Sequence, residues 1–155
     1  MRSIRRADEF EDMVRRLADE AHPDAGRSIF PSMRELMCFA AVLGFQEERR
    51  FKLEGKKTHE IDYRIWQNND LALDLLYLIP LAAERNLNLL RPETEDLLVE
   101  VFEEFANGGL EIMQSWLNET PDDPHGDRAL LNALHKHGYL SVPKKVDAVI
   151  DQIKF

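Results

Sequence analysis

The chain has 155 residues, of which 44% are hydrophobic, with 20 Lys and Arg against 29 Asp and Glu and a single cysteine. One cysteine excludes a disulfide framework, and a formal net charge of -9 argues against indiscriminate binding to nucleic acid. The length of the chain predicts one domain over residues 1–155. We expect no membrane partner and a cytoplasmic location, because neither a signal peptide nor a long apolar run is present.

The first helix is predicted from about Asp8 to Ala21, where Asp8 and Glu11 have the spacing of a capping box. The second has a clearer start, with Ser32 and Glu35 at the same spacing, and should end between residues 44 and 48. Two helices therefore fill most of the first third of the chain.

Residues 49–66 change period. "RRFKL" and "IDYRIW" alternate between apolar and polar residues, and the turn-rich "EGKKTH" separates them. This pattern predicts a β-hairpin.

Helical spacing returns after "QNND", where Asn68, Asn69 or Asp70 can cap, and we expect a kink or stop at Pro80. The longest helix is predicted over residues 93–118, and C-terminal helices over residues 127–155. The expected fold is mainly α: a single compact domain of about five to six helices with one small β-hairpin.

Two adjacent glycines, Gly108 and Gly109, interrupt the longest predicted helix in "FEEFANGGLEIM". Apolar positions before and after them stay in phase, which favours a continuous helix although each glycine costs up to about 1 kcal/mol. The pair indicates close packing of another helix or strand. The alternatives are a partner or ligand that approaches the backbone, and a helix break with "ANGG" as a cap.

No catalytic signature is present. The histidines have no metal-ligand spacing, Cys38 lies on an apolar helix face, and we predict neither catalytic residues nor a metal or cofactor. The one candidate metal loop is "DDPHGD", with Asp122, Asp123, His125 and Asp127. A cryptic metal-dependent nuclease subunit using the last three of these is the alternative from the enzyme class.

The basic residues are more informative than the histidines. Residues 1–64 hold 13 Lys or Arg and 13 Asp or Glu, so the whole acidic excess lies in the remainder. "RRFKLEGKK" carries five basic residues against one acid. The proposed DNA contacts are Arg34, Arg49, Arg50, Lys52, Lys56 and Lys57.

The acidic second half suggests a different surface. Glu100, Glu103, Glu104 and Glu111 share the longest helix and would repel DNA. A protein-only adaptor that uses this helix and the surface around the glycine pair is therefore a second hypothesis. The sequence leaves open whether the chain forms a homo-oligomer.

Two segments resemble a known family. Ile29 to Glu35, "IFPSMRE", and Ala106 to Ile112, "ANGGLEI", are similar to segments of Dnd system-associated protein 4, a small accessory protein of bacterial DNA phosphorothioation cassettes. "RRADEFEDMVRRL" and "WQNND" are compatible, so the resemblance extends to about Leu117.

The resemblance implies a non-enzymatic accessory component of a phosphorothioation-linked modification and restriction system that defends bacteria against phage. Such a component would contact DNA, other proteins of the cassette, or both. No catalytic residue carries over from the family.

Overall fold

The computed structural model describes residues 1–141, and the predicted helical segment after Ser141 lies outside them. The helices are α1 (Glu11–Ala18), α2 (Met33–Gln46), α3 (Tyr63–Gln67), α4 (Asp70–Glu84), α5 (Glu95–Asn118) and α6 (Asp127–Lys136). The strands are β1 (Ile4–Ala7) and β2 (Thr58–Ile61), and short 3-10 turns are η1 (Asp8–Phe10), η2 (Leu87–Leu90) and η3 (Pro92–Thr94). The mainly α prediction is confirmed.

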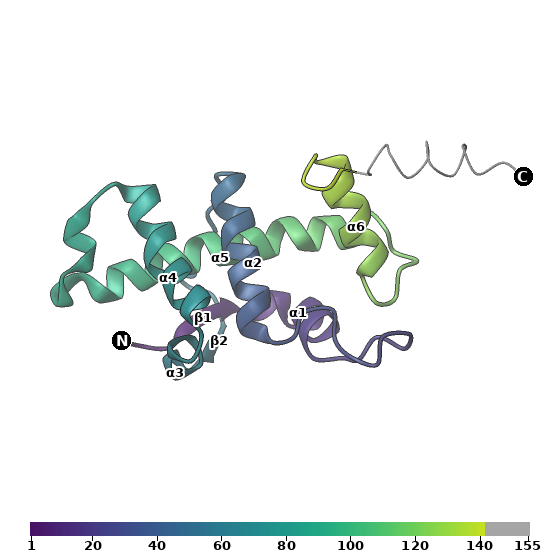
Figure 1. Ribbon diagram of the computed structural model, residues 1–155, viewed down its shortest axis with the longest axis horizontal. Coiled ribbons are helices and arrows are strands. Elements are labelled where there is room, and N and C mark those ends of the chain that lie inside the picture. Colours follow the sequence, from purple (N-terminus) through teal and green to yellow (C-terminus); the bar gives the residue numbers. More distant parts are fainter. Residues whose placement is uncertain (142–155) are drawn as a thin grey trace, which may run out of the picture.

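Helix α5 runs along the long axis of the molecule, and the other elements pack around it (Figure 1). α2 crosses α5 near its middle, α4 lies toward its N-terminal half, and α6 lies at its C-terminal end. The core is continuous, with Trp66, Phe102, Leu110 and Met113 among its fully buried side chains. In the part of the chain that is described, no helix is long and apolar enough to cross a membrane.

The predicted hairpin over residues 49–66 is wrong. β2 pairs antiparallel with β1 at the N-terminus, with Ile4 opposite Ile61, so the sheet joins segments distant in sequence. Residues 49–53 form no strand; the amide of Phe51 donates to the carbonyl of Glu104 on α5 at 2.9 Å. Asp62 ends the alternation of "IDYRIW" because its carboxylate caps α3, accepting from the amide of Arg64.

The starts of α2 and α4 follow local capping chemistry, whereas the start of α1 does not. Ser32 caps α2 and Asn69 caps α4, where its side chain accepts from the amide of Ala72 at 2.9 Å. At the first predicted helix the structure has η1 and then α1, with no side-chain cap. The Asp8 carboxylate contacts His59 of β2 at 2.5 Å instead, so a contact with the sheet displaces the predicted capping box.

Of the kink or stop predicted at Pro80, the stop is wrong, because helix α4 continues through Pro80 to Glu84. Proline removes one backbone hydrogen bond, but Ile79 and Pro80 are buried in the core, and packing of an apolar face stabilises the helix around that gap. The helix ends where Arg85 adopts a left-handed conformation, with φ of 50°.

Candidate functional site

The glycine pair lies where α5 meets other parts of its own chain. α5 is continuous from Glu95 to Asn118, as predicted. A Cβ atom on Gly109 would overlap the carbonyl of Ala40 in α2, and one on Gly108 would overlap the carbonyl of Arg49. Gly44 of α2 faces the carbonyl of Phe105 in the same way. The chain itself therefore occupies the space beside these glycines.

Three of the six proposed DNA contacts are arginines engaged with nearby carboxylates. Arg34 pairs with Glu35 at 2.5 Å, and Arg49 pairs with Glu111 of α5. Arg50 pairs with both Glu84 and Glu104, and its guanidinium lies 4.6 Å from the centre of the Phe105 ring. Arg49 and Arg50 thus link the segment after α2 to α4 and α5, whereas Arg34 donates to the carbonyl of Ile65 in α3.

The three lysines lie on the loop before β2. Lys56 pairs with Glu9 at 3.2 Å and Lys57 with Asp8 at 3.7 Å, both at exposed positions. Within residues 1–141, Lys52 alone of the six has no carboxylate within 4 Å. Five of the six cations thus lie beside carboxylates, and the six do not form one continuous basic face.

Glu103, which the sequence suggests is part of an acidic helix surface, is buried, with a side chain 1% exposed. Its carboxylate accepts from the guanidinium groups of Arg2 and Arg5, with bonds of 3.0 Å to each, and from the amide of Arg5 at 2.7 Å. One turn later Asn107, also buried, accepts from the amide of Ala7 at 2.8 Å. The two side chains bind β1 to α5.

The spacing of four residues between Glu103 and Asn107 is the sequence signal for this arrangement, because it puts both on one helix face. Sequence reasoning missed it because β1 itself was not predicted. The acidic surface of the adaptor hypothesis is accordingly smaller than expected, with Glu104 and Glu111 also engaged by arginines.

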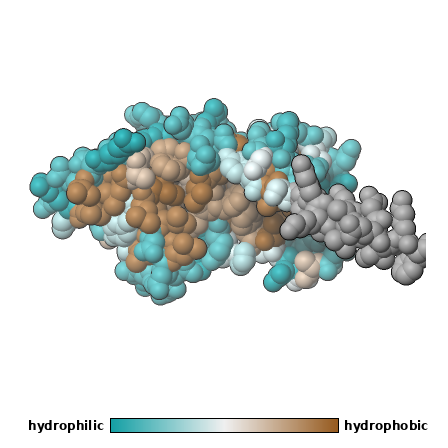
Figure 2. Space-filling model, turned by 45° about the horizontal axis from the view of Figure 1, so that its top comes forward, coloured by the Kyte–Doolittle hydropathy of each residue, from teal (hydrophilic) through white to brown (hydrophobic). Residues whose placement is uncertain are grey.

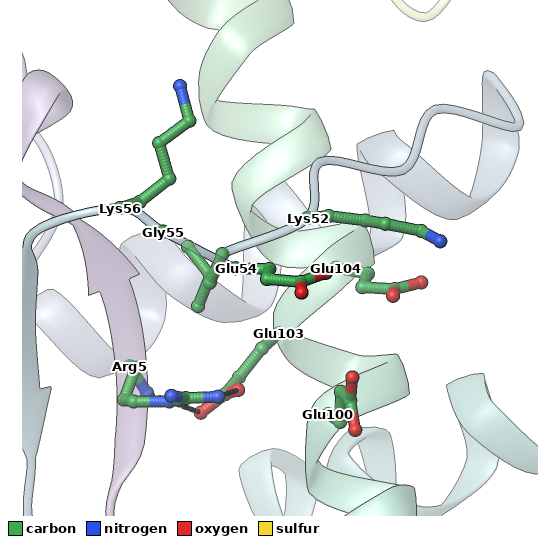
Figure 3. Close-up of a pocket in the computed structure, with 9 residues that line it drawn as sticks. Arg5, Lys52, Glu54, Gly55, Lys56, Glu100, Glu103 and Glu104 are labelled. Carbon is green, nitrogen blue, oxygen red and sulfur yellow. Dashed lines mark hydrogen bonds and ion pairs between the residues drawn. The ribbon is translucent and has the colours of Figure 1, made fainter.

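A pocket of about 420 Å³ lies between this region and the lysine loop (Figure 3). Arg5, Lys52 and Lys56 line it together with Glu100 and Glu104, among others. The carboxylate of Glu103 meets the guanidinium of Arg5 at its wall (Figure 3). Charges of both signs line the pocket, so it favours neither an anion nor a cation.

The side chains of the candidate metal loop make contacts with other parts of the fold. Asp123 is buried and accepts from the amide of Ala129 at 2.9 Å, which stabilises the start of α6. Burial disfavours its charged form, but the backbone donors outweigh burial and lower the pKa of Asp123. Asp127 contacts His22 at 3.3 Å, and the rings of His22 and His125 pack edge to face. No group of three ligating side chains within residues 1–141 has the geometry to hold a metal.

Cys38 lies at the edge of the core on α2 and is 9% exposed. Burial raises the pKa of its thiol to about 11. The thiolate, which is the nucleophilic form, is therefore scarce at neutral pH.

Exposed apolar side chains lie on α2, on α4, on the segment that follows α4 and at the start of α5. We call this set the apolar surface; its members are Val42, Leu71, Leu78, Leu87, Leu90 and Leu97. Figure 2 shows a broad hydrophobic area on the face that carries α2 and α4. Such areas are uncommon on proteins that act alone and mark sites of interaction.

A groove of about 330 Å³ between α2 and α4 lies within the apolar surface. Phe39 and Val42 line one side, and Leu71 and Leu75 line the other. The pair Arg34 and Glu35 closes one end, where the two charges offset each other. The groove presents an almost entirely apolar lining to solvent.

The chain matches a known protein family. The family model described as DNA sulphur modification system-associated protein 4 matches residues 3–147 of the chain. The chain belongs to this family. No curated protein and no solved structure matches the chain.

Membership in the DNA sulphur modification system-associated protein 4 family makes the protein an associated component of such a system. The two motifs that carry the resemblance flank the α2–α5 contact. Ile29 to Glu35 leads into α2, and Ala106 to Ile112 contains the glycines against which α2 packs. In this family member both motifs have an evident role in the fold.

Proposed function

We propose that the protein is a non-enzymatic accessory component of a DNA sulphur modification system and acts by binding another protein of that system. The observation that carries the proposal is the apolar surface, on which Leu71 is 68% exposed and Leu78 58% exposed. Apolar side chains of this size are exposed at a cost unless a partner covers them. Membership in the family supports association with the modification system, and the apolar surface supports action by protein binding.

Binding of DNA through Lys52, Lys56 and Lys57 is the second candidate. These lysines share one exposed loop, and exposed ion pairs such as those of Lys56 and Lys57 contribute little, so phosphate groups could replace their carboxylates. Arg34, Arg49 and Arg50 do not belong to this candidate. The ion pairs of Arg49 and Arg50 join the segment after α2 to α4 and α5, whereas Arg34 pairs with the adjacent Glu35 and donates to the carbonyl of Ile65 in α3.

The test is affinity purification of the tagged full chain from a host with its complete modification system, with nuclease treatment and high salt in one arm. We expect a protein of the system to be retained in both arms, because apolar contacts resist salt. Recovery of DNA alone, lost at high salt, would support the second candidate and contradict the first.

A further inference from the structure

The groove between α2 and α4 has the shape and lining of a helix-binding site. Leu71, Leu75 and Leu78 follow one another at steps of four and three on α4, and Phe39 and Val42 are three apart on α2. Two rows of apolar side chains, one on each helix, with a hollow between them form a surface that can receive the apolar stripe of a third helix.

The charge beside the groove limits what this helix is. Asp70 and Asp74 are exposed and lie one turn apart on α4, and Asp74 is three residues from Leu71 and four from Leu78, so it lies beside both on the helix surface. Among residues 1–141 neither carboxylate has a cation within 4 Å, whereas the two charged residues that line the groove itself, Arg34 and Glu35, are paired with each other. The groove thus has a negative flank that is not neutralised.

We propose, on the basis of the proposed function, that this groove binds an amphipathic helix of another protein, with an apolar stripe flanked by Lys or Arg. The apolar stripe fills the space between Val42 and Leu75, and the cations face Asp70 and Asp74. A second copy of this chain is a poorer occupant. Its own Asp70 and Asp74 would approach those of the first, and like charges across an interface weaken association.

The probe is a fluorescent synthetic helix of about 18 residues, with leucines on one stripe and lysines on both flanks. A second peptide has glutamate in place of every flanking lysine. Anisotropy titration of the full chain should give binding of the lysine peptide about tenfold or more tighter than of the glutamate peptide.

Variants separate the groove from the rest of the surface. Leu71→Asn with Leu78→Asn changes a lining residue and the exposed leucine that continues its row on α4, and it should weaken binding of the lysine peptide about tenfold or more. Leu87→Asn, beyond the end of α4, should not weaken it. Asp70→Asn with Asp74→Asn should reduce the preference for lysine. The matched loss of two exposed charges elsewhere, Glu93→Gln with Asp122→Asn, should leave it unchanged.

Equal binding of the lysine peptide by the wild type and by the Leu71, Leu78 variant would overturn the inference. So would a dimer that this variant dissociates, or peptide binding that appears only after removal of residues 142–155, because the groove would then have an occupant from the same chain.

Different results would contradict the proposed function and this inference. A system protein that still co-purifies with the Leu71, Leu78 variant overturns the groove as its binding site but leaves the adaptor role standing. Failure of the wild-type chain to retain any system protein overturns the adaptor role itself.

Discussion

Gly109 of α5 lies against the main-chain carbonyl of Ala40 in α2, with no space for a side chain between the two helices. We expect Gly109→Ala to lower the free energy of unfolding by about 2 kcal/mol, measured by urea denaturation. Alanine favours a helix over glycine by up to about 1 kcal/mol, so a loss of stability would show that packing outweighs propensity.

Ser115→Ala, at an exposed position of the same helix, is the control and should change the free energy of unfolding by less than about 0.5 kcal/mol. A Gly109→Ala protein as stable as the wild type would mean that α2 does not approach α5 this closely.

Glu103 joins β1 to α5, and we expect removal of its charge to lower the free energy of unfolding. Glu103→Gln keeps the size of the side chain but leaves Arg2 and Arg5 without their carboxylate. Because both arginines are partly exposed, we expect a loss of about 2 kcal/mol in urea unfolding, less than for a fully buried pair. Glu100→Gln, an exposed position one turn away, should have little effect, and equal effects of the two changes would contradict the buried role of Glu103.

Asp8 should make part of the stability depend on pH. The hydrogen bond with His59 lowers the pKa of the Asp8 carboxyl below its usual 3.8 in the folded chain. A lowered folded pKa stabilises the protein above the unfolded value, and this contribution is lost as the pH falls through the folded pKa.

The stability of the wild type relative to Asp8→Asn should therefore decrease between about pH 6 and about pH 3, measured as the difference in urea midpoints. An unchanged difference across this range would argue against the contact between η1 and β2. Asp12→Asn, an exposed carboxylate on α1, serves as the control.

Cys38 should be inert in the folded protein. With a thiol pKa of about 11, roughly one thiol in a thousand is ionised at about pH 8. A thiol reagent should react slowly with the native chain and at the rate of a free thiol after unfolding in urea. Rapid reaction of the native chain would mean that Cys38 is exposed and activated.

The sequence predicted α2 and α5 well because local signals define them. Ser32 with Glu35 marks the start of α2, and the unbroken phase through Gly109 marks α5 as one helix. The sequence did not predict the pairing of the strands. Thr58–Ile61 pairs with Ile4–Ala7, and a contact between segments so far apart in the chain leaves no local sequence pattern.

The candidate site was less predictable than the fold. Basic residues at positions 49–57 suggested a DNA-binding face, but Arg50 meets acids from α4 and α5 that only the tertiary structure brings to it. The sequence also does not reveal that Leu71 and Leu78 are exposed, because an apolar stripe on a helix has the same spacing whether the core or a partner covers it.

The most direct test of the adaptor role compares three tagged chains in the host that carries the system. They are the wild type, a chain with Lys52, Lys56 and Lys57 changed to Glu, and a chain with Leu71, Leu78, Leu87 and Leu90 changed to Asn. The amounts of co-purified system proteins and of DNA are measured for each. We predict that the lysine variant retains the partner protein and that the leucine variant loses it while remaining folded by circular dichroism. Retention of the partner by the leucine variant, with loss of partner and DNA by the lysine variant, would contradict the account.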